Sequence, residues 1–244
     1  MKKLNTILAI VGVFASAAAF SQCSTANLSA WTSTVNPDLR LDVTAPAAMG
    51  SSTCGLESSV DFDNKHYVQD DSPSAEQRYR GAFCIDPNSI SMPASGTFRR
   101  LKVMNVRCPG PGAGGTCPWR QLMQMKLQNN AGNYNIQGFV RDGAGLPNNG
   151  STKNTYDFDI SDAPTRIEWD LNITTGAFRV WANATAETDT PVVTKTVDLS
   201  QWTDGVDSLR VGGLNNPTSL TEGATIFLDD VETRRQTFIG GSCL

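Results

Sequence analysis

The sequence contains a single histidine, His66, among its 244 residues. A metal centre built from several imidazoles is therefore excluded, and so is any mechanism that needs two of them. No Cys-x-x-Cys pair is present, which argues against a zinc ribbon. No Gly-x-Ser-x-Gly motif is present either, so the nucleophile turn of an α/β-hydrolase is missing.

Charge and long apolar runs are also scarce. Only 18% of the residues are charged, with 20 Lys and Arg against 24 Asp and Glu, and the formal net charge is −4. An acidic chain has no general attraction to nucleic acid phosphates, so a nucleic acid partner is not expected. Beyond the N-terminus no apolar stretch approaches the length of a membrane-spanning helix, so no membrane span is expected.

The N-terminal segment is typical of a secretory signal peptide, which we place at residues 1–22. Lys2 and Lys3 precede an apolar run at 7–14, and small residues lead to a cleavage-type sequence at 19–21. We therefore predict that the protein is secreted, and that the rest of the chain folds in an oxidising compartment.

The six cysteines are an even set, which in such a compartment predicts disulfides. Cys108 and Cys117 enclose a short segment rich in Gly and Pro, so we predict that they pair and clasp this loop. For the other four we expect Cys23–Cys243, which would join the two ends of the chain, and Cys54–Cys84.

Apolar and polar residues alternate with a period of two through most of the chain, and clusters of Asn, Asp, Gly and Pro separate the runs. This pattern predicts antiparallel strands at 78–85, 100–103, 123–128, 134–141, 166–171, 178–183, 209–211 and 226–228. So many half-apolar strands require two sheets packed face to face. The fold class predicted is an all-β, disulfide-stabilised, two-sheet antiparallel β-sandwich. Residues 54–244 form its one domain, preceded by an N-terminal strand or extension at 23–53.

Several blocks of sequence resemble those of secreted bacterial proteins with a concanavalin A-like (laminin G-like) jelly-roll domain of the lectin and glucanase type. The blocks lie at 67–73, 76–83, 162–170, 207–213 and 227–235, so that the resemblance extends over residues 54–239. It implies a jelly-roll fold and a bacterial protein of the periplasm, the cell surface or the extracellular medium.

The similarity to jelly-roll glucanases makes one strand a candidate active site. These enzymes carry the pattern Glu-x-Asp-x-Glu, whose carboxyl groups act as nucleophile and acid/base. Here Glu168 and Asp170 match the first two positions, but Asn172 stands at the third and cannot protonate a leaving group. We therefore predict that the protein is not an enzyme. The alternative is a glycoside-active enzyme with a degenerate Glu168/Asp170 site.

Related jelly rolls also hold a structural calcium ion through an aspartate of the last strand. Asp229 and Asp230 are the candidates for this role, since Ca²⁺ prefers oxygen ligands. The competing interpretation is a β-bulge, because two adjacent Asp residues interrupt the alternation.

Polar strand faces suggest a binding function. An indole on a polar face can stack on a sugar ring, while amide and guanidinium groups bond to its hydroxyls. The candidate ligand-binding residues are Gln137, Arg141, Arg179, Trp181 and Arg210. The expected function is non-catalytic binding of a polysaccharide or of another cell-surface or matrix component. Two alternatives remain: the glucanase-type enzyme, or a structural envelope protein without a small ligand. Trp181 could instead pack beneath a loop.

Overall fold

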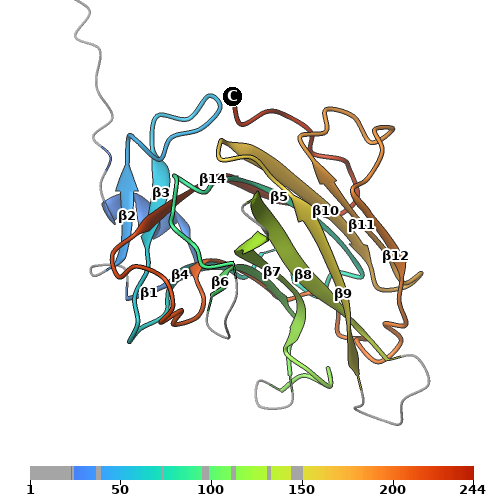
Figure 1. Cartoon of the computed structure of the whole chain (residues 1–244). Helices are drawn as coiled ribbons and strands as arrows, with labels where there is room; N and C mark the ends of the chain where they lie inside the picture. The colour runs from blue at the N-terminus through green and yellow to red at the C-terminus, as the bar shows by residue number, and fades with distance from the viewer. Residues whose placement is uncertain are drawn as a thin grey trace, which may run out of the picture.

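The alternating residues build two antiparallel sheets of seven strands each, stacked as two layers (Figure 1). The computed structural model describes residues 23, 25–36, 40–72, 74–94, 99–110, 114–130, 133–143 and 151–244. The predicted signal peptide lies outside these residues. Sheet A contains, in spatial order, β1 (Ser33–Val35), β4 (His66–Asp70), β13 (Ser208–Gly213), β6 (Leu101–Arg107), β7 (Gln121–Asn130), β8 (Asn133–Asp142) and β9 (Thr152–Asp159).

Sheet B contains, in the same way, β12 (Val193–Thr196), β11 (Ala177–Ala182), β10 (Thr165–Asn172), β5 (Arg78–Asp86), β14 (Thr225–Arg234), β3 (Gly55–Ser59) and β2 (Leu41–Thr44). A short 3-10 helix, η1 (Thr25–Ala30), precedes β1. The predicted two-sheet β-sandwich is thus confirmed. Within the described residues, no helix has the length and apolar character needed to cross a membrane.

The N-terminal segment set apart by the sequence supplies an edge strand to each sheet. β1 pairs with β4 in sheet A, and β2 pairs with β3 in sheet B. The part of the chain before residue 54 therefore contributes one strand to each sheet of the sandwich. These strands escape a periodicity search because three or four residues are too few to display an alternation.

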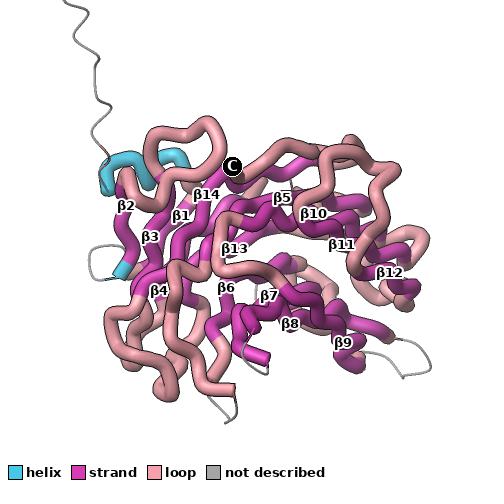
Figure 2. The backbone as a smooth tube through the Cα atoms, turned by 45° about the horizontal axis from the view of Figure 1, so that its top comes forward, coloured by secondary structure: helices cyan, strands magenta, loops and turns pink. Residues whose placement is uncertain are grey.

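The inner faces of the two sheets pack against each other and form the core. Trp169 of β10 is fully buried there, and the rings of Tyr156 in β9 and Phe178 in β11 meet across the layers with centroids 5.2 Å apart. Burying one such side chain stabilises the fold by about 1.5–3 kcal/mol. Figure 2 shows the layer of β5, β10 and β11 lying over the layer of β6 to β9.

Two glycines allow this close packing. A Cβ atom on Gly81 would lie 2.1 Å from Cζ2 of Trp169, and one on Gly138 would lie 2.2 Å from Cζ of Tyr156. Both positions are inside strands, where glycine is normally unfavourable. The indole and the phenol ring occupy the space that a side chain would need, which explains these glycines.

The structure contains three disulfides, and two of them differ from the predicted pairs. Cys108 is joined to Cys117, as the loop predicted, but Cys23 is joined to Cys54 and Cys84 to Cys243. The expected Cys23–Cys243 and Cys54–Cys84 pairs are therefore wrong. Cys84 lies on the outer face of β5, where the C-terminal segment crosses sheet B. The spacing of the cysteines in the sequence does not indicate this crossing, so the pairing could not be predicted from it.

Candidate functional site

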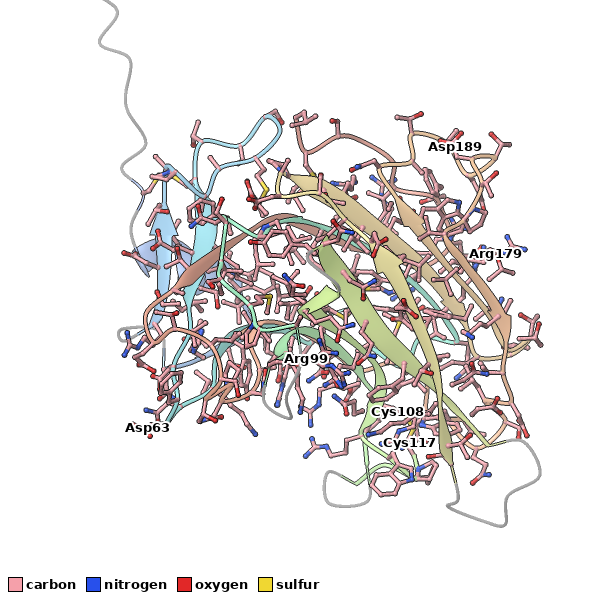
Figure 3. All side chains as sticks on the ribbon, viewed as in Figure 1. Asp63, Arg99, Cys108, Cys117, Arg179 and Asp189 are labelled. Carbon is pink, nitrogen blue, oxygen red and sulfur yellow. A yellow bond between two sulfur atoms is a disulfide. The ribbon has the colours of Figure 1, made fainter. Side chains whose placement is uncertain are left out.

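The five residues predicted to bind a ligand lie on two opposite surfaces of the sandwich. Gln137, Arg141 and Arg210 are on the outer face of sheet A, whereas Arg179 and Trp181 are on the outer face of sheet B. Figure 3 shows Arg179 pointing outward beside β11, far from the nitrogen-rich side chains around Arg99 below β6 to β8. The predicted set therefore does not form one site.

Trp181 packs beneath a loop. Its side chain is only 1% exposed, and Nε1 donates a hydrogen bond to the backbone oxygen of Asp189 at 2.9 Å. Its ring meets that of Phe238 edge-on, with centroids 5.5 Å apart. The indole consequently has no open face on which a sugar could stack.

Glu168 and Asp170 also have structural partners on this face. Glu168 is 2% exposed and accepts hydrogen bonds from the backbone N–H groups of Ile239 and Gly240, at 2.8 and 2.9 Å. Burial raises the pKa of Glu168, against the effect of these bonds.

The neighbouring Asp170 forms ion pairs with Arg78 and Arg80, at 2.8 and 3.0 Å. Burial raises the pKa of Asp170, but the two guanidinium groups outweigh it and lower the pKa overall. The C-terminal segment and these arginines thus occupy the carboxylates of the degenerate glucanase pattern.

The Asp229–Asp230 pair forms a β-bulge. The register of β14 against β5 shifts between Asp229 and Glu232, and Asp230 has a φ of 47°. Asp229 accepts the N–H of Met49 at 2.7 Å, and Asp230 pairs with the guanidinium of Arg166. These partners are donors and cations, so the two carboxylates do not fit a calcium site. The described residues contain no group of three or more metal-ligating side chains.

His66 lies between the sheets, away from both outer faces. It is fully buried, and its Nε2 is 2.9 Å from Oγ of Ser58 on the opposite sheet. Burial lowers the pKa of His66 to about 4, so the ring is neutral at neutral pH. Its position excludes it from contact with a ligand on either outer face.

The outer face of sheet A carries the polar side chains that remain open to a ligand. Residues paired across antiparallel strands point to the same side and lie about 4.5–5.5 Å apart at Cβ. Lys102 of β6, Lys126 of β7, Gln137 of β8 and Asp157 of β9 are paired in this way and form one row across the sheet.

A second row lies beside the first. Nε of Arg210 donates to Oε1 of Gln69 at 2.5 Å, and the guanidinium stands 4.5 Å from the ring centre of Tyr67. The next residues in the row are Asn105 and Gln124, and the amide of Gln124 donates to Oδ1 of Asn105 at 2.9 Å. These side chains are therefore held in fixed positions on the face.

On the other side of Lys126 a chain of hydrogen bonds crosses three strands. Nε of Arg100 donates to Oε1 of Gln128 at 2.6 Å, and Nε2 of Gln128 donates to Oδ1 of Asn135 at 3.0 Å. Nδ2 of Asn135 in turn donates to Oδ1 of Asp159 at 3.0 Å. Satisfied polar networks of this kind are rigid, so Lys126 lies between two preorganised rows of amides.

The same face concentrates positive charge. Its cations are Arg100, Lys102, Arg107, Lys126, Arg141, Lys153 and Arg210. None of them forms an ion pair with a carboxylate of the described residues, although the whole chain has a net charge of −4. These seven cations outnumber Asp157 and Asp159, the carboxylates of the same rows, so the face is positive and attracts anionic ligands.

Among these cations, Lys126 has the pKa that is shifted most from its usual value. Burial, together with the positive charges of Arg100, Lys102 and Lys153, lowers the pKa of Lys126 to about 8. An amine with such a pKa is partly neutral near physiological pH and can accept a proton. The alternation in the strand predicted at 123–128 puts Lys126 on the polar side, but only the register of the strands revealed its cationic neighbours.

Trp119 presents an exposed indole beside Arg141, near the C-terminal end of β8. Its side chain is 47% exposed, and the guanidinium of Arg141 lies 4.6 Å from the ring centre. Trp119 comes two residues after Cys117, at the end of the clasped loop whose two cysteines Figure 3 labels. Sequence reasoning missed it because it follows a loop and belongs to no alternating run.

No family model matches the sequence, and the search of curated proteins finds no match. Solved structures do match the fold. An alginate lyase from Pseudomonas aeruginosa superposes with a TM-score of 0.55 at 15% identity, covering 87% of this chain and 91% of that one. A family 7 alginate lyase, A1-II′, in complex with substrate gives 0.51 at 12% identity, with 91% and 88% covered. A GH131 β-glucanase catalytic domain from Podospora anserina gives 0.51 at 12% identity, with 91% and 95% covered.

These similarities show a shared jelly-roll fold. They also overturn the prediction that the protein is not an enzyme. That prediction depended on the missing third carboxylate at Asn172, yet chains with this fold over nearly their whole length are catalytic lyases and a glucanase. The absence of a third carboxylate on the Glu168 strand is therefore no evidence against catalysis elsewhere on this fold.

Proposed function

We propose that this protein is a polysaccharide-cleaving enzyme and that it binds an anionic, uronate-containing glycan on the outer face of sheet A. The observation that carries the proposal is the half-buried Lys126, whose pKa is lowered to about 8 amid cations without carboxylate partners. The cations of this face repel one another, and a polyanion that lies on the face would stabilise them.

The polar rows suit a chain of sugars. Gln137 lies beside Lys126 in the first row, and no hydrogen bond occupies its amide within the described residues. The amide can donate to a carboxylate or a hydroxyl. Lys102 on β6 and Arg210 on β13 add positive charge on the side of Lys126 away from Gln137. Each successive uronate would thus meet a cation and an amide.

The chemistry that this arrangement supports is β-elimination. The neutral amine of Lys126 takes the proton on the carbon next to the uronate carboxylate, and the C–H electron pair forms a double bond as the C–O bond to the leaving sugar breaks. The leaving oxygen takes a proton from the new ammonium of Lys126. Lys102 and Gln137 stabilise the charge that develops on the carboxylate in the transition state.

The comparisons support a substrate of this class. Two of the structures that share the fold are alginate lyases, and alginate is a linear polymer of uronic acids. Three disulfides support folding in an oxidising compartment. We therefore keep the export of the protein to the periplasm or surroundings of a bacterium as part of the proposal.

The test is the turnover of alginate and other polyuronates by the wild-type protein and by Lys126→Met. We expect an unsaturated product, detected by its ultraviolet absorbance, and a fall of kcat by about 10²–10⁴-fold in the variant. Lys195→Met, which removes a lysine from β12 of the other sheet, is the matched control and should keep full activity. Reducing ends without an unsaturated product, or full turnover by Lys126→Met, would refute the elimination.

A further inference from the structure

Trp119 and Arg141 lie together at one end of the face that carries Lys126. The indole is nearly half exposed, and one of its faces lies against the guanidinium. We propose that this pair is a second sugar-binding subsite, which takes a uronate residue remote from the reacting one. The subsite deepens the proposed function, since it assumes that an anionic glycan occupies this face.

Arg141 points to an anionic ligand. Its side chain is only 8% exposed, yet no carboxylate of the described residues pairs with it. Nε donates to the backbone oxygen of Gln121 at 3.2 Å and Nη1 to Oγ of Ser151 at 3.3 Å. Nη2 has no hydrogen-bond partner in the described part of the chain. A buried charge without a counterion is costly, and a ligand carboxylate would compensate it.

Trp119 supplies the complementary apolar contact. A pyranose has a face of C–H groups that packs on an aromatic ring, and indoles are the largest such rings. A uronate placed here would lay its C–H face on the indole and direct its carboxylate toward Arg141. A neutral sugar would gain the first contact without the second.

The segment 114–120, which carries Trp119, is anchored before a ligand arrives. The disulfide to Cys108 holds Cys117, and the N–H of Cys108 donates to the backbone oxygen of Arg120 at 2.8 Å. Nε1 of Trp202 donates to the backbone oxygen of Trp119 at 3.3 Å. A preorganised indole loses little conformational freedom on binding, so more of the contact energy appears as affinity.

The subsite is separate from the reacting position. Arg141 is four residues along β8 from Gln137, which pairs with Lys126, and this corresponds to about 14 Å along the strand. A single pyranose is shorter than this distance. Only an oligosaccharide that extends beyond the cleaved linkage can therefore reach both positions.

The test measures binding of an alginate octasaccharide by calorimetry, with Lys126→Met as the parent so that the ligand is not consumed. We expect Trp119→Ala to weaken binding about five- to tenfold, Trp119→Phe to retain most of the affinity, and Arg179→Ala to match the parent. Arg179 is an exposed arginine of sheet B and is the matched control. A neutral cello-oligosaccharide of equal length should bind more weakly than the uronate.

Equal affinity of Trp119→Ala and Arg179→Ala for the octasaccharide would overturn the subsite. Equal affinity for the neutral and anionic chains would overturn the role of Arg141. If Trp119-dependent binding is found but the wild-type protein releases no product, the proposed catalysis fails while the subsite stands. If the wild-type protein cleaves alginate but binding ignores Trp119, only the subsite fails.

Discussion

Lys126 and His66 are two basic side chains of sheet A that lie in different environments. Both have a pKa lowered by burial, to about 8 and about 4. His66 points into the core, where its ring meets Ser58, whereas Lys126 points outward among three other cations. Alternation along the strands causes this difference, because neighbouring residues in a strand face opposite sides.

The cations next to Lys126 lead to a prediction about pH. They disfavour its charged form, so replacing Lys102 by Met should raise the pKa of Lys126. The proposed base is the neutral amine, and its activity rises with pH through the pKa. The profile of kcat in Lys102→Met should therefore move to higher pH, by less than about one unit. An unchanged profile, or one displaced to lower pH, would contradict Lys126 as the base.

The strands β10 and β11 show how an element can look functional and serve the fold. On their outer face Glu168 binds the backbone of the C-terminal segment, and the Cys84–Cys243 disulfide joins that segment to β5. Trp181 packs against Phe238 of the same segment. This face is thus covered by its own chain, while the outer face of sheet A keeps its polar rows free.

The covering of β10 predicts the effect of Glu168→Gln. The carboxylate accepts two backbone N–H groups, and the amide oxygen of Gln can replace only one of its two acceptors. The free energy of unfolding should fall by about 1–3 kcal/mol in denaturant titrations, with polyuronate turnover unchanged.

Lys126→Met is the counterpart of this variant, since it should lose turnover and keep the stability of the wild type. Loss of activity in Glu168→Gln at full stability would return the active site to sheet B.

At the scale of the whole molecule, charge is distributed unevenly. The chain is acidic overall, yet the outer face of sheet A gathers seven cations, among them Lys102, Lys153 and Arg107. Their mutual repulsion is visible in Arg107, whose pKa is lowered by burial and by the charges of Arg210 and Arg120. A long anionic chain would relieve this repulsion across several strands.

Salt dependence tests this charge distribution. Exposed charges farther apart than about 10 Å are largely screened at 0.1 M salt, so KM for a polyuronate should rise with ionic strength. The double variant Lys102→Gln/Lys153→Gln should show a weaker dependence, whereas Arg179→Gln on the other sheet should follow the wild type. Identical slopes in all three proteins would mean that this face does not bind the polyanion.

Each of the eight strands predicted from the alternation overlaps a strand of the structure, but β3, β4, β9 and β12 were not predicted. The alternation around Met123, Ile136 and Trp169 gave the inner faces correctly, because burial of one strand face repeats every second residue. It also gave Gln137 and Arg141 as outward-facing residues. The Cys108–Cys117 pair could also be predicted, because the two cysteines enclose a short segment rich in Gly and Pro and their pairing does not depend on the rest of the fold.

Which sheet each outer face belongs to was decided only by the tertiary structure. Periodicity assigns a side to Trp181 and to Arg210, but not whether the two sides are the same, since strands far apart in the sequence alternate between the sheets. The burial of Trp181 results from the C-terminal segment, whose Phe238 packs on the indole. The position of that segment depends on long-range packing, and no local pattern of residues encodes it.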